Sequence, residues 1–230
     1  MLYIIQSILY RQKVLSAHNL YGELKDIINL LPAWENKPQK WLIANPLKEI
    51  VALSNSAVSS EALDYLDGLI SKNKTISIVL ASEEKDESPV VIWYKNTPAV
   101  SPDRYSLTIA IRSLDSLNDR NTFQKIITDI SDLKHWTYSY ISLETEQYRM
   151  EQRSVFEDRL SAGWMLYLPE EISSNEVPSA ADIVHFPERK STLVITKNEF
   201  DGKNESDIIC ANNVEIELSE NGHLPKWLDV

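Results

Sequence analysis

The chain has 230 residues, 43% hydrophobic and 25% charged, which are ordinary values for a protein that buries its own core. Its one cysteine, Cys210, excludes an internal disulfide and therefore a disulfide-stapled secreted scaffold. The net charge of -11 is uneven, because residues 1–115 hold 12 basic and 13 acidic side chains and residues 116–230 hold 11 and 21. This charge disfavours nucleic acid and anionic membranes and favours a basic protein partner. The alternative is acidity that only maintains solubility.

The chain begins with an apolar segment, Leu2–Tyr10, which precedes its first basic residues. A signal peptide has the reverse order, so this segment is predicted to be a strand of the folded protein. No run approaches the roughly 20 apolar residues that a membrane span needs. These features predict a cytoplasmic protein that does not bind membranes.

Two amphipathic helices are predicted next. Ser16 is the expected N-cap of the first helix, and Ser59 or Ser60 that of the second. Their apolar positions recur at helical spacing: Leu20, Leu24, Ile27, Ile28 and Leu31, then Leu63, Leu66, Leu69 and Ile70. Three strand-like segments follow, at Thr75–Leu80, Val90–Tyr94 and Tyr105–Arg112, and together they predict an antiparallel meander.

The second half mixes helical and strand patterns. Asn121 or Thr122 is the predicted cap of a third helix, which buries Phe123, Ile126, Ile127, Ile130 and Leu133. Strands are predicted at Trp136–Leu143, Gly163–Leu168, Thr192–Thr196 and Val214–Leu218. Short helices are predicted near Pro178, with Ala181 and Val184 inward, and at Asn204–Asn212. This order predicts an α+β fold, a mostly antiparallel sheet with several amphipathic helices, in one domain over 1–230 with a possible weak subdivision near 144–154.

Catalytic and metal motifs are missing from the sequence. The four histidines, His18, His135, His185 and His223, are dispersed, and no HExxH, GxGxxG, P-loop or GxSxG pattern occurs. Cys210 lies in an apolar run and is expected to be a buried, inert thiol. We therefore predict no catalytic, metal or cofactor-binding residue. The many carboxylates keep a carboxylate-dependent hydrolase open as an alternative, although Glu35-x-Lys37 lies in a predicted loop.

Six tryptophans divide by context. Trp93, Trp136 and Trp164 lie in strand-like runs and are predicted to be core residues. Trp34, Trp41 and Trp227 lie in loop or terminal contexts, where a tryptophan either packs beneath a loop or anchors an interface.

Acidic side chains near the C-terminus form the candidate partner-binding surface. If Val214–Leu218 is a strand, Glu215 and Glu217 project to one solvent face and Val214, Ile216 and Leu218 to the core. Such a face can steer a basic partner, or it can simply be solvated. The predicted partner-binding residues are Glu199, Asp201, Glu205, Asp207, Glu215, Glu217, Glu220 and Trp227.

One run of the sequence, Val155–Pro169 (VFEDRLSAGWMLYLP), resembles the most characteristic segment of the immunity protein 52 family. Ala211–Leu218 (ANNVEIEL) resembles a second segment of that family, and Leu224-Pro225 resembles its closing one. A glycine-containing stretch of the family is replaced here by Pro187–Ser191. The resemblance implies an α+β fold, no catalysis and residence in the bacterial cytoplasm. It also implies binding to one cognate nuclease toxin with a restriction-endonuclease-like domain, delivered by a contact-dependent or type VI secretion system.

The charge and the resemblance converge on one expected function. A nuclease binds phosphates, so its cleft is expected to be basic, and an acidic inhibitor can block the cleft or bind beside it. We therefore expect an immunity protein that neutralises a cognate nuclease toxin. A secretion adaptor or chaperone for an effector is the alternative, and the hydrolase is a weaker one.

Overall fold

The computed structural model describes residues 1–11, 16–31, 39–45, 48–54, 57–73, 76–82, 90–96, 103–112, 119–133 and 136–230. The predictions for Trp34, for Glu35-x-Lys37 and for His135 lie outside these residues.

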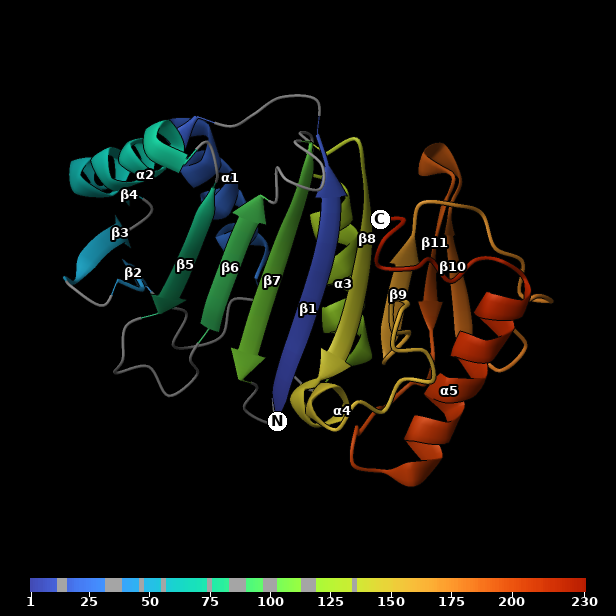
Figure 1. Ribbon diagram of the computed structural model, residues 1–230. Helices are drawn as coiled ribbons and strands as arrows, with labels where there is room; N and C mark the ends of the chain where they lie inside the picture. The colour runs from blue at the N-terminus through green and yellow to red at the C-terminus, as the bar shows by residue number, and fades with distance from the viewer. Residues whose placement is uncertain are drawn as a thin grey trace.

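A single antiparallel sheet runs through the described chain, in the order β10-β11-β9-β8-β1-β7-β6-β5-β2-β3-β4 (Figure 1). Its strands are β1 Leu2–Tyr10, β2 Lys40–Ile43, β3 Ile50–Ser54, β4 Ala57–Val58, β5 Ser77–Ser82, β6 Val90–Asn96, β7 Arg104–Arg112, β8 Tyr138–Thr145, β9 Met165–Leu168, β10 Asp182–Phe186 and β11 Ser191–Ile195. β8 pairs with β1 on one side and with β9 on the other. The sheet is thus continuous across the segment 144–154.

Five α-helices in the described part of the chain flank the sheet, which confirms the α+β prediction. They are α1 Ala17–Leu30, α2 Ser60–Asn73, α3 Arg120–Ser131, α4 Glu146–Met150 and α5 Glu205–Glu220. In the view of Figure 1, α1 and α3 lie behind the sheet, α2 lies beside α1 at the upper left, and α4 and α5 lie in front. The two faces of the sheet are therefore covered by different parts of the chain.

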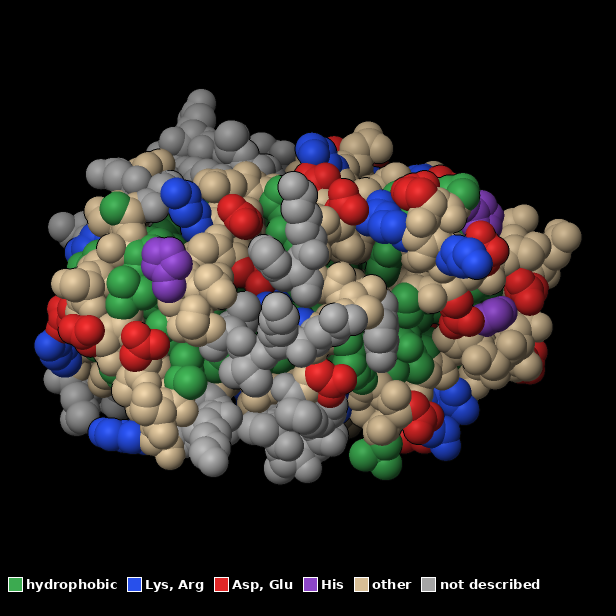
Figure 2. Space-filling view, turned by 90° about the horizontal axis from the view of Figure 1, so that it is seen from above, with side chains coloured by type: hydrophobic (Ala, Val, Ile, Leu, Met, Phe, Trp, Pro, Cys, Tyr) green, Lys and Arg blue, Asp and Glu red, His purple; other side chains and the backbone are tan. Residues whose placement is uncertain are grey.

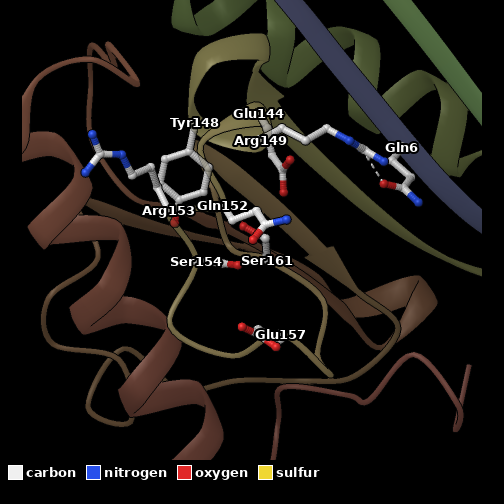
Figure 3. A pocket seen from close by; sticks show the side chains of 9 residues that line it. All are labelled: Gln6, Glu144, Tyr148, Arg149, Gln152, Arg153, Ser154, Glu157 and Ser161. Carbon is white, nitrogen blue, oxygen red and sulfur yellow. Dashed lines mark hydrogen bonds between the residues drawn. The ribbon is translucent and has the colours of Figure 1, made fainter.

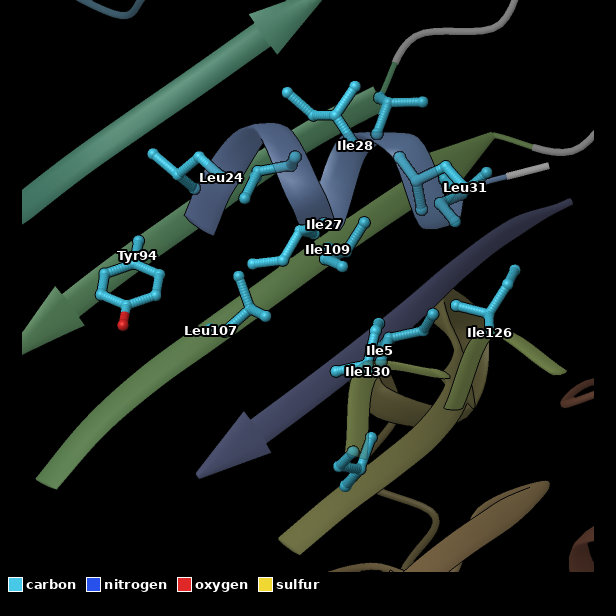
Figure 4. Packing of buried hydrophobic residues seen from close by; sticks show 14 of the residues in the cluster. Ile5, Leu24, Ile27, Ile28, Leu31, Tyr94, Leu107, Ile109, Ile126 and Ile130 are labelled. Atoms are coloured by element: carbon cyan, nitrogen blue, oxygen red, sulfur yellow. The ribbon is translucent and has the colours of Figure 1, made fainter. Parts of the chain in front are cut away.

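The main core lies mostly between the sheet and the rear helices. Ile5, Leu107 and Ile109 point from alternate strand positions toward Ile27 of α1 and Ile130 of α3 (Figure 4). A second apolar cluster lies between β9, β11 and α5, and includes Leu166, Val194, Val214 and Leu218. Successive strand residues point to opposite faces, so β9 contributes Met165 and Tyr167 to the first cluster and Leu166 and Leu168 to the second.

The predicted helix starts agree with the structure in two of three cases. Ser16 Oγ accepts the Asn19 N–H at 3.2 Å, and Ser59 Oγ accepts the Ala62 N–H at 3.1 Å. The third prediction was wrong, because Asp119 caps α3 by accepting the Thr122 N–H at 3.1 Å. An aspartate two residues before the expected cap already satisfies the free N–H groups of the first turn.

Two secondary-structure predictions in the last quarter are corrected. The expected helix near Pro178 is absent from the structure, where Asp182–Phe186 forms β10 and pairs with β11; Val184 is half-buried in β10, and Ala181 is exposed. The expected strand Val214–Leu218 is the second half of α5, which continues to Glu220. The alternation of apolar and acidic side chains suggested a strand. In α5, however, the buried residues recur every three or four positions, as expected of a helix: Asp207, Ile208, Ala211, Val214, Glu215 and Leu218.

Candidate functional site

A buried glutamate of α5 organises the front face of the sheet. Glu215 has no exposed surface, and its carboxylate accepts the backbone N–H groups of Val155 at 2.7 Å and Ala162 at 2.9 Å. The hydroxyls of Ser161 and Tyr148 donate to the same carboxylate at 3.0 and 3.3 Å. Burial raises the pKa of Glu215, although these hydrogen bonds act in the opposite direction. Glu215 therefore fixes the loop that follows α4.

Gly163 closes that loop against β8. Its φ is +49°, and a Cβ added there would lie 2.6 Å from the Leu143 carbonyl oxygen, so both the backbone conformation and the space require glycine. The next residue, Trp164, donates its backbone N–H to the same carbonyl at 2.8 Å and its indole N–H to the Lys197 carbonyl at 2.9 Å. The Ala162-Gly163-Trp164 motif is thus a tight junction between β8 and β9.

A small pocket opens where β1, β8, α4 and this loop meet (Figure 3). Its volume is about 280 Å³. The lining side chains carry both signs of charge and several hydrogen-bonding groups: Gln6, Glu144, Tyr148, Arg149, Gln152, Arg153, Ser154, Glu157 and Ser161.

Glu144, on β8, is the buried carboxylate of this pocket. It is 7% exposed, and in Figure 3 its side chain points toward Gln152 and Ser161. Burial raises the pKa of Glu144, while the neighbouring Ser161 hydroxyl and the charge of Arg149 partly oppose that rise. Glu144 makes no ion pair within 4.0 Å in the part of the chain that the structure describes.

The two arginines of the pocket bind other partners. Arg149 donates to the Gln6 side-chain oxygen at 2.6 Å. The Arg153 guanidinium binds Glu151 through two nitrogens, at 2.8 and 2.6 Å, and lies 3.5 Å from Glu205 of α5. The contact between Arg153 and Glu205 places the start of α5 beside the pocket.

The predicted partner-binding residues separate into exposed and internal groups. Glu199, Glu205 and Glu220 are exposed, and Asp201 is half-buried. Asp207 is buried, binds Lys197 at 2.5 Å and accepts the Asp201 N–H at 2.8 Å, and these contacts lower its pKa despite its burial. The carboxylates of Asp207 and Glu215 therefore bind groups within the protein itself.

The other two predicted residues hold the C-terminal part together. Glu217 is half-buried and binds the N–H and hydroxyl of Ser179 at 3.0 and 2.5 Å. Glu215 and Glu217 lie on a helix, where residues three or four apart share a face and residues two apart do not. The two side chains therefore do not share a solvent face. Trp227 packs with Ile8, Leu160 and Val230.

The tryptophan predictions need two corrections. Trp41 lies in β2 and is 2% exposed, so its loop context was wrong, and it is a core residue. Trp93 was expected in the core but is 40% exposed, because it lies on the face of β6 opposite the rear helices. Trp164 is 1% exposed, as predicted, and Trp136 is half-buried, donating its indole N–H to Glu23 at 3.0 Å.

The remaining sequence predictions concern cysteine, metals and membranes. Cys210 is half-buried, with its sulfur 3.6 Å from the carbonyl oxygens of Ser179 and Thr196, and burial raises the pKa of its thiol. Among the described residues, no three His, Cys, Asp or Glu side chains gather as metal ligands would. None of the described helices has the length and apolar character needed to span a bilayer.

Charges of both signs share the surface over β9–β11 and α5. Figure 2 shows, at its right-hand end, Asp and Glu side chains interspersed with Lys and Arg side chains and two histidines. On the face seen in Figure 2, the acidic side chains at this end therefore lie as separate groups among basic ones. Partner binding should therefore be tested at individual carboxylates, because this face does not carry a uniform negative charge.

No protein-family model matches the chain, and no curated protein matches it. Among solved structures, the chain is similar to "Pseudomonas aeruginosa T6SS protein PA0821", with a TM-score of 0.51. The two are 10% identical, and the match covers 93% of this chain and 72% of that chain. This likeness shows the fold alone. Membership of the immunity protein 52 family stays a prediction.

Proposed function

We propose that this chain is an immunity protein that binds and neutralises a cognate bacterial nuclease toxin. The observation that carries the proposal is the position of exposed carboxylates beside a pocket on the front face. Glu205 at the start of α5 contacts Arg153 of the pocket wall, and Glu157 lines the same pocket. A nuclease cleft that binds phosphates is basic, and carboxylates arranged around a recess suit the side chains of such a surface.

Two further observations support this function. The Val155–Pro169 run, which resembles the immunity protein 52 family, forms the loop and strand that build the pocket wall and β9. One solved structure with a similar fold is named a T6SS protein, and type VI secretion is one delivery route that the family resemblance implies for the toxin. Both observations point to a role in bacterial competition through protein binding.

The proposal requires a nuclease toxin encoded in a neighbouring gene, and co-expression of this chain with such a toxin tests it. We expect a complex on size exclusion, loss of nuclease activity in that complex, and survival of cells that express both proteins. Continued killing with separate elution of the two proteins would refute the proposal. A stable complex in which the nuclease remains fully active would instead identify a secretion adaptor.

A further inference from the structure

The pocket beside α4 has the size of a side-chain site. Its volume of about 280 Å³ lies at the lower limit of the roughly 300–1,000 Å³ of small-molecule pockets. It opens on the same face as Glu205 and is walled by strands, a helix and a loop that Glu215 holds in place. A single long side chain from a partner protein would fit a recess of this size.

The buried carboxylate of the pocket, Glu144, has a neighbour whose proton is already used. Glu144 and Ser161 both line the pocket, and the Ser161 hydroxyl donates to Glu215 at 3.0 Å. A serine hydroxyl has one proton to donate, so Ser161 cannot donate to Glu144 at the same time. Of these two buried carboxylates, Glu144 is the one that lines the pocket.

The positive charges around Glu144 do not compensate it fully. Arg149 acts on Glu144 through its charge, but its guanidinium donates to Gln6 and is exposed. Arg153 is held by Glu151 and lies near Glu205. Glu157, the third carboxylate here, lines the pocket and is exposed. A buried carboxylate without a close cation is costly, and an entering cation removes that cost.

We propose that this pocket receives the cationic end of one lysine or arginine side chain of the partner protein, which pairs with Glu144. The inference rests on the proposed function for the identity of the partner, but its chemistry is a property of this chain. A basic side chain is abundant on a surface that binds phosphates. Desolvated inside the pocket, its ion pair with Glu144 would act as an anchor, while the exposed carboxylates guide approach.

The pocket can be tested without any partner, with n-butylguanidinium as the cationic probe and N-butylurea as its neutral counterpart. NMR titration of the isolated chain should show saturable shifts at Gln152, Ser161 and the Glu144 carboxyl group with the cation and none with the urea. The Glu144→Gln variant should weaken the cation's affinity by about tenfold or more. Glu146→Gln, an exposed change on α4 outside the pocket lining, should leave it unchanged.

Several outcomes would overturn the inference. These are an absence of saturable shifts with the cation, equal shifts with both probes, or equal affinity in Glu144→Gln and the wild type. Saturable binding of inorganic phosphate that is lost in Arg149→Gln would identify an anion site instead. If Glu144→Gln does not fold, the wild-type comparison decides, because a paired cation must lower the pKa of Glu144 and the urea must not.

The complex gives an independent readout. With the toxin bound, Glu144→Gln should accelerate dissociation by about tenfold and change association little, as expected of a buried contact. Unchanged dissociation would remove the pocket from the interface while leaving the immunity function intact. Failure to bind any toxin would refute the proposed function and would not affect the probe titration.

Discussion

Glu215 of α5 accepts a hydrogen bond from the backbone N–H of Ala162 at 2.9 Å, across 53 residues of sequence. This contact joins two segments that resemble the immunity protein 52 family, Ala211–Leu218 and Val155–Pro169. The third segment joins them, because the Leu160 N–H donates to the Pro225 carbonyl at 3.0 Å. The three segments therefore pack as one unit, and the contacts between them maintain the shape of the front face.

Replacing Glu215 with alanine should destabilise the protein strongly. The change removes the acceptor of the Val155 and Ala162 N–H groups and leaves both donors without this partner inside the fold. We expect a loss of about 3 kcal/mol or more in the free energy of unfolding, measured by urea denaturation. Glu220→Ala, at the exposed end of the same helix, should stay within about 0.5 kcal/mol of the wild type. Equal losses in the two variants would contradict this role of Glu215.

Trp164 should be much costlier to truncate than the exposed Trp93. It is buried against Tyr3 and Phe123, with ring centroids 5.7 and 5.5 Å away. Trp164→Ala should lower the free energy of unfolding by about 3–5 kcal/mol, because it leaves a large cavity. Trp93→Ala, at an exposed position of β6, provides the control and should cost less than about 2 kcal/mol. Thermal and urea unfolding of both variants would measure the difference, and a smaller loss at Trp164 would be contrary evidence.

The sequence predicted the part of the fold that periodicity encodes. Leu20, Leu24 and Ile27 of α1 recur at helical spacing, and Tyr105, Leu107 and Ile109 of β7 alternate, so each pattern had one reading. Val214–Leu218 permitted two readings, because Val-Glu-Ile-Glu-Leu alternates and also continues the helical burial pattern of α5. The choice between strand and helix depends on the contacts of Glu215 with Ser161 and Ala162, which are distant in sequence.

The site was harder to predict than the fold. The signal for Glu144 in the sequence is one acidic residue at the end of an apolar strand, and its importance comes from Ser161 and Arg149, which folding brings near it. The exposure of Glu199 and Glu205 could be predicted, because acidic residues in a polar stretch of sequence usually lie at the surface. Buried members such as Asp207 have the same composition but a structural use, which only the tertiary contacts distinguish.

His223 should make stability depend on pH. Its Nδ1 lies 3.1 Å from Glu170 and its Nε2 lies 3.3 Å from Glu176. Burial acts to lower the pKa of His223, but the two carboxylates outweigh burial and raise it above the ordinary value of 6.5. A pKa raised by folding gives stability that is fully present below the unfolded pKa and is lost as the pH rises through the folded pKa.

The measurement is the free energy of unfolding between about pH 5 and pH 9, for the wild type and His223→Gln. The wild-type advantage should be largest at the acidic end and should decline above the ordinary histidine pKa. Glu144 and Glu215 also have raised pKa values and change stability in the same sense, but both variants contain them, so their effect cancels in the difference. A difference that is flat with pH would show that His223 has no raised pKa.

Reversing the exposed acidic residues should slow binding of the toxin. Glu199, Glu205 and Glu220 are exposed, whereas Asp207 and Glu215 are buried and would disrupt folding if reversed. The triple change of the exposed residues to lysine should reduce the association rate by about tenfold at low salt and flatten its dependence on ionic strength. The dissociation rate should change much less, because exposed charges guide the encounter and contribute little once the interface has closed.

The control must alter net charge equally at the opposite end of the sheet. Asp26 of α1 and Asp64 and Asp67 of α2 are exposed, and in Figure 1 these helices lie at the end of the molecule away from α5. Their triple change to lysine should leave the association rate near the wild-type value at about 0.15 M salt, where charges farther apart than about 8 Å are screened. Stopped-flow association at several salt concentrations separates the two cases. Equal slowing in both variants would mean that net charge alone, and not the position of Glu199, Glu205 and Glu220, steers the partner.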